Sequence, residues 1–183
     1  MSKFYITTPL YYVNDEPHIG HAYTTILADV ISRIKKKQDN DVFFLTGTDE
    51  HGQKVQEAAE KRNVSPKEHV DEYVARFKNT WKKLNIDYDY FIRTTDENHK
   101  NRVKEILNNL YETGEIYFDE YEGLYSVSEE RFITEKEMEE GNFREIKKIK
   151  EKNYFFKMSK YNLKLIKHIE SNENFILPKS RRN

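Results

Sequence analysis

The 183-residue sequence contains no cysteine, which excludes disulfide bonds and any zinc site built on cysteine ligands. No apolar run approaches the length that spans a membrane, and the start, Met1-Ser2-Lys3-Phe4, does not resemble a secretory signal. The formal net charge is only −1, so any contact with nucleic acid must come from local patches of charge. These absences favour a cytoplasmic protein without disulfides.

Aromatic residues make up 14% of the chain, and they supply large apolar surfaces among charged residues that make up 34%. The length is sufficient for one or two domains with a buried core. The chain is therefore expected to fold despite its high polarity.

The apolar spacing of the first 45 residues predicts a strand, a helix and a second strand. A short strand is expected at 4–6, and Val42 to Leu45 are typical of a strand buried on both faces of a parallel sheet. Between them, apolar residues recur every three or four positions and predict a helix with one buried face: Ile19, Ala22, Tyr23, Ile26, Leu27, Val30, Ile31 and Ile34. We therefore predict an α/β fold, the first half of a doubly wound parallel sheet that binds ligands at the carboxyl ends of its strands.

Further elements follow the same alternation. Ser65 and Glu68 have the spacing of a capping box at the start of a helix that begins with Pro66. The residues expected to face inward on three helices are Val55, Ala58 and Ala59; Val70, Tyr73, Val74, Phe77, Trp81 and Leu84; and Val103, Ile106, Leu107, Leu110 and Tyr111. A short strand is expected at 91–93.

The pattern changes at Gly114. Alternating, tyrosine-rich segments predict short antiparallel strands, followed by an acidic helical turn at 135–140 and a charged strand or linker at 146–152. A last helix is expected to bury Tyr161, Leu165, Ile166 and Ile169. We predict two domains, residues 1–114 and an α+β domain at 115–183.

Two histidines, His18 and His21, flank Gly20 between the first strand and the first helix. The unpaired N–H groups of a helix start favour phosphate, and imidazoles can donate hydrogen bonds to phosphate oxygens. Gly20 has no side chain to block a close approach by a ring or a phosphate. The alternative is that both histidines lie at the surface, or that one is satisfied in the core.

A second polar segment, Gly47-Thr48-Asp49-Glu50-His51-Gly52, follows the strand at 42–45, on the same predicted edge of the sheet. The Asp49 carboxylate can pair there with the ammonium group of an amino acid. The alternative role for Asp49 is to cap the helix that follows.

Pro17-His18-Ile19-Gly20-His21 resembles the HIGH motif of class I aminoacyl-tRNA synthetases. Tyr11-Tyr12-Val13-Asn14, Ala22-Tyr23-Thr24-Thr25 and the segment 47–52 are similar to the methionyl-tRNA synthetase family in particular. The resemblance covers essentially the whole chain, which would correspond to the amino-terminal part of such an enzyme. It implies a Rossmann-like, HUP-type nucleotide-binding sheet carrying an inserted connective domain.

The resemblance also implies a function. A synthetase of this family joins methionine to ATP, forming methionyl-adenylate, and transfers the methionyl group to tRNA(Met). His18 and His21 would be catalytic and bind ATP, Gly20 would bind the adenine, and Asp49 would bind the amino group of methionine. Tyr12 and Leu10 would line the methionine pocket, although core packing remains an alternative for Leu10. Magnesium would accompany ATP, and no protein ligand for it is visible. These roles require the two strand ends to face a shared hollow.

Lys157-Met158-Ser159-Lys160 is similar to the second motif of class I synthetases, a lysine loop that steadies pyrophosphate. The fifth residue is Tyr161 where that motif has serine, and the position in the chain is wrong. We therefore expect no catalytic role for this segment and place Met158 in helix-start packing. Without the lysine loop, the chain alone is expected to bind ATP or methionine weakly and not to act as a ligase.

Ser126 and Glu129 stand where many members of the family carry the first cysteine pair of a zinc knuckle. Serine and a single glutamate do not form a structural zinc site, so the resemblance implies a metal-free connective domain.

Several alternatives stay open. The chain could be a non-catalytic module derived from a synthetase, or a small nucleotidyltransferase with a HIGH motif, although the latter lacks the segment 47–52. Lys179, Arg181 and Arg182 can contact a tRNA backbone or form a solvated loop. The sequence does not indicate an oligomeric state or a role for Glu50.

Overall fold

The computed structural model describes residues 2–129, 131–141, 143 and 145–182. Its contacts divide the chain into two compact units, residues 1–104 and 105–183. The division lies inside helix α4 (Glu97–Glu112), whereas the sequence predicts a boundary at residue 114, which stays a prediction.

The first unit contains a parallel sheet, as predicted. Its strands are β1 (Lys3–Thr7), β2 (Tyr11–Tyr12), β3 (Asp41–Asp49) and β4 (Tyr90–Arg93). Leu45 pairs with both β1 and β4, and Thr48 pairs with both β2 and β4. It follows that β1 and β2 share one edge of β3, while β4 occupies the other edge.

An extra residue interrupts the edge formed by β1 and β2. Thr7 pairs with Leu45 and Tyr11 pairs with Thr48, so three residues, 8–10, lie opposite only two, 46 and 47. Such a bulge reverses which side chains face the core beyond it. As a result Tyr11 is buried, whereas Tyr12 is 51% exposed. The pairing of both tyrosines with β3 extends the sheet beyond the strand expected at 4–6.

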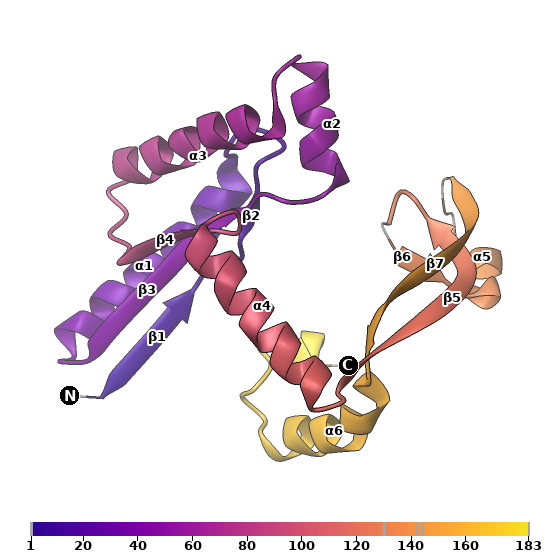
Figure 1. Ribbon diagram of the computed structural model, residues 1–183. Coiled ribbons are helices and arrows are strands. Elements are labelled where there is room, and N and C mark those ends of the chain that lie inside the picture. The colour runs from indigo at the N-terminus through magenta and orange to yellow at the C-terminus, as the bar shows by residue number, and fades with distance from the viewer. Residues whose placement is uncertain (1, 130, 142, 144, 183) are drawn as a thin grey trace. The chain divides into compact units, whose positions relative to one another are not determined.

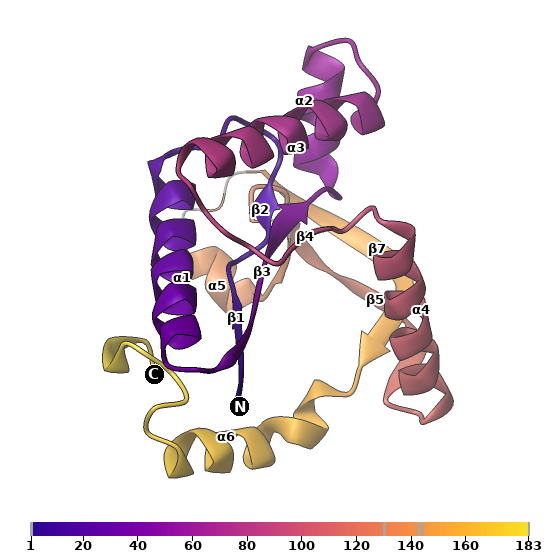
Figure 2. The same cartoon turned by 90° about the vertical axis from the view of Figure 1, so that its left-hand side faces the viewer.

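Helices α1 (Ile19–Lys37), α2 (Gln53–Lys61) and α3 (Pro66–Lys83) complete the first unit. Helix α1 lies along β1 and β3 in both views (Figure 1 and Figure 2). Helix α3 begins with the predicted capping box of Ser65 and Glu68. The core gathers apolar side chains from β2, β4, α2, α3 and the segment after β2: Tyr11, Val13, Val55, Val70, Tyr73, Val74, Phe77, Trp81 and Phe91. Ala59 is buried as predicted, and Leu84 is exposed where burial was predicted.

The predicted buried face of α1 is wrong. The helix instead buries small and polar side chains, namely Thr25, Ala28, Asp29 and Ser32. Asp29 accepts hydrogen bonds from the backbone N–H of Asp87, between α3 and β4, at 2.9 Å and from Arg33 Nε at 2.7 Å, so this buried carboxylate is satisfied. Six of the eight residues predicted to be buried are exposed: Ile19, Tyr23, Ile26, Leu27, Val30 and Ile34.

The strand predicted at 42–45 is confirmed as part of β3, but it is not buried on both faces. Phe44 is fully buried, whereas its neighbour Phe43 is 48% exposed and stacks on Tyr5 of β1 with ring centroids 6.0 Å apart. One face of this sheet is therefore open in the structure.

The second unit is α+β, as the sequence predicts for this region. Strands β5 (Ile116–Ser126), β6 (Arg131–Ile133) and β7 (Ile146–Phe156) form an antiparallel sheet in the order β6-β5-β7. Helix α5 (Glu135–Glu140) follows β6, and β7 leads through the 3₁₀ helix η1 (Met158–Tyr161) into helix α6 (Asn162–Ser171) and the 3₁₀ helix η2 (Lys179–Arg181). The pairing of β5 with β7 runs from Ile116 to Ser126, longer than the short strands predicted.

Three burial predictions, for α4, α6 and Met158, are wrong. Neither α4 nor α6 buries any residue, although the predicted residues do lie on helices. Met158 is 68% exposed and does not pack at a helix start. Within the described residues, no helix combines the length and apolarity needed to cross a bilayer.

Candidate active site at the start of helix α1

His18 and His21 cap the amino end of α1 with their own side chains. The backbone N–H of Gly20 donates to His18 Nδ1 at 3.1 Å, and the backbone N–H of His18 donates to His21 Nδ1 at 3.2 Å. The two rings stack with centroids 3.7 Å apart. The prediction that the N–H groups at this helix start remain unpaired is therefore wrong for Gly20. Its N–H already donates a hydrogen bond to His18 Nδ1.

This capping determines the tautomer of both rings. Since each Nδ1 accepts a hydrogen bond, the ring proton of a neutral imidazole must lie on Nε2. Burial lowers the pKa of His21 below its ordinary value, and the neighbouring His18 lowers it further. His21 is thus kept neutral near pH 7, with Nε2–H available to donate to a ligand.

Gly20 is needed because the His18 ring folds back over it. A Cβ at this position would lie 3.0 Å from His18 Cε1 and 3.1 Å from His18 Nδ1, closer than ordinary contacts. The glycine has an ordinary helical backbone, so it is its lack of a side chain that matters here.

Aromatic rings pack against the His21 ring, and a hydroxyl group hydrogen-bonds to its backbone carbonyl. Its ring lies 4.7 Å from the ring of Tyr11 and 5.2 Å from that of Phe77. The hydroxyls of Tyr11 and Thr25 are 2.8 Å apart, and Thr25 Oγ1 donates to the His21 carbonyl at 2.8 Å. Because the bulge turns Tyr11 inward, the strand edge itself supplies this support.

Four of the predicted site residues line one hollow of about 390 Å³: Leu10, Tyr12, His18 and His21. Leu10 is 37% exposed, which argues against simple core packing for this side chain. The remaining lining residues are Tyr11, Asn14, Asp15 and Glu16.

Asp49 does not line that hollow, but it lies next to it in the sheet. Its pairing partner across the sheet is Tyr12, which does line the hollow. Helix α2 begins after Gly52 without a side-chain cap, so the alternative role of Asp49 as a helix cap is excluded. Thr94 Oγ1 lies 3.5 Å from Asp49 Oδ1.

Two groups near the site were missed by the sequence analysis. Glu50 is buried and forms a bidentate ion pair with Arg93 at the end of β4. A signal for this pair existed, since the carboxyl ends of neighbouring parallel strands meet at one edge. His69 of α3 is also fully buried, with Nε2 2.7 Å from the Val13 carbonyl, and no local signal connects these two residues.

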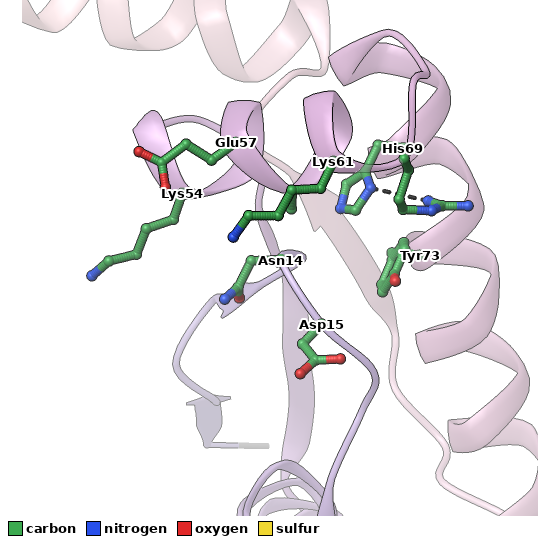
Figure 3. Close-up of a pocket in the computed structure, with 9 residues that line it drawn as sticks. Asn14, Asp15, Lys54, Glu57, Lys61, His69 and Tyr73 are labelled. Atoms are coloured by element: carbon green, nitrogen blue, oxygen red, sulfur yellow. Dashed lines mark hydrogen bonds between the residues drawn. The ribbon is translucent and has the colours of Figure 1, made fainter.

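A second hollow of about 380 Å³ adjoins the first and shares Asn14 and Asp15 with it. Figure 3 shows Lys54, Glu57 and Lys61 on α2 above these two residues, with His69 and Tyr73 on α3 beside them. The dashed contact is the 3.0 Å approach of Arg62 to His69 Nδ1. Asn14 and Asp15 therefore form part of the lining of both hollows.

In the second unit, the predicted lysine segment is engaged locally. Lys160 pairs with Glu115, which lowers the pKa of that carboxyl, and the Lys157 N–H donates to the Glu115 carbonyl at 2.9 Å. Ser126 Oγ accepts from the Glu129 N–H at 3.3 Å.

The basic residues near the end of the chain make some local contacts. Lys179 lies 3.4 Å from Glu173, and Arg182 donates to the Ile169 carbonyl at 2.8 Å. A tRNA contact by Lys179, Arg181 or Arg182 stays a prediction.

A family model described as "tRNA synthetases class I (M)" matches residues 4–143. The methionine–tRNA ligase of Clostridium perfringens (strain 13 / Type A) is 52% identical to this chain, over 98% of the chain and 28% of the relative. The methionine–tRNA ligase of Listeria monocytogenes serovar 1/2a is 48% identical, over 100% of the chain and 30% of the relative. The chain thus spans less than a third of the length of these relatives.

Solved structures agree with this comparison. The methionyl-tRNA synthetase of Mycobacterium tuberculosis, solved in complex with methionyl-adenylate, is similar over 100% of this chain and 38% of its own, with a TM-score of 0.91 and 40% identity. The LeuRS of Agrobacterium radiobacter K84, solved in a ternary complex with tRNA and LeuAMS, shares the fold with a TM-score of 0.84 at 22% identity.

Proposed function

The chain belongs to the class I tRNA synthetases of the methionyl type, and on this basis we propose that it carries the HIGH-motif half of the catalytic domain of a methionine–tRNA ligase. The complete reaction would join methionine to ATP with release of pyrophosphate, and would then transfer the methionyl group from the adenylate to tRNA(Met) with release of AMP. The observation that carries the proposal is the common hollow of Leu10, Tyr12, His18 and His21, with Asp49 paired to Tyr12 across the sheet. Translation takes place in the cytoplasm, which is the proposed location.

In this proposal, His18 and His21 act on the phosphates of ATP. Their Nε2–H groups are directed away from the helix backbone because both Nδ1 atoms accept backbone hydrogen bonds. Donors of fixed orientation can stabilise the charge that develops on the α-phosphate oxygens and need no rearrangement during the reaction. Gly20 would leave space for the adenine, in addition to the space that it leaves for the His18 ring.

Asp49, Tyr12 and Leu10 would bind the amino acid. The Asp49 carboxylate supplies a charge-assisted acceptor for the ammonium group, at the end of a parallel strand where ligands of such sheets bind. Leu10 and Tyr12 present partly exposed apolar surface to the hollow that they share with His18 and His21, beside Asp49 in the sheet, and would contact the methionine side chain. Positioning of the carboxylate of methionine against the α-phosphate would then account for much of the rate.

The substrates and partners of this proposal are methionine, ATP with Mg²⁺, and tRNA(Met). Magnesium enters with the nucleotide, and we assign no protein ligand to it. We further propose that residues 115–183 form the connective domain in a metal-free form, with Ser126 and Glu129 at the positions of the first cysteine pair.

Titration calorimetry with L-methionine and with ATP tests this function. Asp49→Asn should weaken methionine binding and leave ATP binding unchanged, whereas His21→Asn should weaken ATP binding. Asp39→Asn is the matched control, because Asp39 has a positive φ of 57° in a turn away from the site, where asparagine is well tolerated. Equal methionine affinity in wild type and Asp49→Asn would refute the assignment.

A further inference from the structure

The Glu50 carboxylate is a buried charge with every oxygen hydrogen-bonded. Arg93 donates to both oxygens, Nε to Oε1 at 2.7 Å and Nη2 to Oε2 at 2.9 Å. Thr48 Oγ1 adds a 2.6 Å hydrogen bond to Oε1, and Thr95 Oγ1 adds a 2.5 Å hydrogen bond to Oε2. The side chain of Glu50 has no exposed surface, so these four donors replace its hydration completely.

Arg93 is held from a second side. Its Nη2 also donates to Asp71 of α3 at 2.6 Å, and the two carboxylates raise the pKa of the guanidinium, Glu50 more than Asp71. Glu50 is fully buried, whereas the Asp71 side chain is 41% exposed. Loss of its partner would therefore leave Glu50 as an uncompensated buried charge, whereas Asp71 is partly hydrated.

The buried cluster joins the carboxyl ends of β3 and β4 on both sides of Asp49. Thr48 and Arg93 are register partners, and the Thr94 N–H donates to the Thr48 carbonyl at 3.2 Å. The Glu50 N–H donates to Thr94 Oγ1 at 2.9 Å, and the same oxygen lies 3.5 Å from Asp49 Oδ1. Asp49 thus lies between two residues that are held in place, and its carboxylate is next to the hydroxyl that holds one of them.

We propose that Glu50 and Arg93 are positioning residues for Asp49, a role that rests on the proposed function of Asp49 in binding the ammonium group of the substrate amino acid. Neither residue touches substrate in this proposal. Their buried ion pair immobilises the backbone at 48–50 and Thr94, so that the Asp49 carboxylate is presented at one place on the sheet edge. Recognition of the ammonium group depends on this preorganisation.

The test uses Glu50→Gln, which keeps the shape and removes the charge, and Asp71→Asn, which makes the same change in the exposed partner of the same arginine. Calorimetry should show L-methionine binding weakened on the order of tenfold by Glu50→Gln, with ATP binding unchanged, since misplacement of a binding group by a fraction of an ångström has effects of this size. Asp71→Asn should stay within about twofold of wild type, as expected for an exposed pair. In an Asp49→Asn background, Glu50→Gln should cause no further loss of methionine affinity.

Hydrogen exchange provides a measurement that does not depend on ligand. Glu50→Gln should speed exchange of the backbone N–H groups at positions 50 and 94, and Asp71→Asn should not. Thr95→Val removes one donor and keeps the ion pair, so it should show the same pattern at smaller amplitude, and it replaces Glu50→Gln if that variant does not fold.

The outcomes separate the two proposals. Absence of L-methionine binding by the wild-type chain counts against the proposed function. In that case hydrogen exchange alone tests whether Glu50 and Arg93 immobilise the backbone at 48–50 and Thr94. Wild-type methionine affinity in Glu50→Gln, an equal loss in the Asp49→Asn background, or unchanged exchange at 50 and 94 would overturn the positioning role.

Discussion

Replacing Phe77 by alanine should damage both the core and the chemistry of His21. Phe77 is fully buried, and its ring lies 5.9 Å from the ring centroids of both Tyr11 and Trp81 and 5.2 Å from that of His21. Removing a phenyl group from such a site loses its transfer free energy and leaves a cavity that closes only in part. We expect the free energy of unfolding to fall by about 3–5 kcal/mol.

The same substitution should raise the pKa of His21 toward its ordinary value. Burial is the main cause of the lowered pKa, and the Phe77 ring forms part of the cover over the imidazole. In wild type, a lowered histidine pKa means that stability is full above the ordinary value and is lost as the pH falls through it toward the lowered one. Phe77→Ala should reduce this part of the pH dependence.

Two measurements check the prediction. Denaturant unfolding can be followed by the fluorescence of Trp81, which is the single tryptophan of the chain and is fully buried in the same cluster. The His21 pKa is measured by NMR titration of its imidazole. Phe43→Ala serves as the control, because Phe43 is 48% exposed on the open face of the sheet and its loss should cost about 1 kcal/mol or less.

The reasoning is refuted if Phe77→Ala and Phe43→Ala lose equal stability. It is also refuted if Phe77→Ala leaves the His21 pKa where it is in wild type, because then burial by this ring is not what lowers it.

Three further predictions follow from other contacts. His18→Gln should raise the pKa of His21 only partly, since the charge of His18 is the smaller of the two causes; NMR titration would contradict this if the pKa returned fully to its ordinary value. The pKa of Glu137 is lowered to about 2 by the backbone N–H of Thr134, then by Arg131 and the Thr134 hydroxyl, so the α5 cap is stabilising above the ordinary carboxyl pKa and lost as the pH falls toward 2. Thr134→Ala should raise the Glu137 pKa in a carboxyl-carbon NMR titration, and no change would argue against the cap. Leu27→Gln, on the exposed apolar face of α1, should leave the unfolding free energy within about 0.5 kcal/mol of wild type in denaturant unfolding, whereas a loss of several kcal/mol would show that this face is packed.

Local features of the sequence were sufficient to predict most elements. The helix after Ser65 begins as its capping box requires, because Ser65 and Glu68 satisfy each other's backbone N–H groups without help from distant residues. The strand at 42–45 and the helix from residue 19 also formed where apolar spacing placed them. These predictions succeeded because they depend on interactions between residues a few positions apart.

The face that a helix buries was not predictable in the same way. The apolar residues of α1 predicted burial on one face, yet the helix packs on the sheet through Thr25, Ala28, Asp29 and Ser32. That choice depends on Asp29 meeting the N–H of Asp87, far along the chain, and hydrophobic periodicity carries no information about such a partner.

The sequence by itself determined the parallel α/β order, the capped start of helix α3 and the motif that brings His18, Gly20 and His21 to a helix start. Only the tertiary structure decided that a bulge at 8–10 turns Tyr11 under His21 and Tyr12 toward the hollow, and that Glu50 meets Arg93 beside Asp49. The physical reason is that strand register and buried ion pairs are set by contacts across the sheet, between residues whose distance along the chain leaves no mark in local spacing.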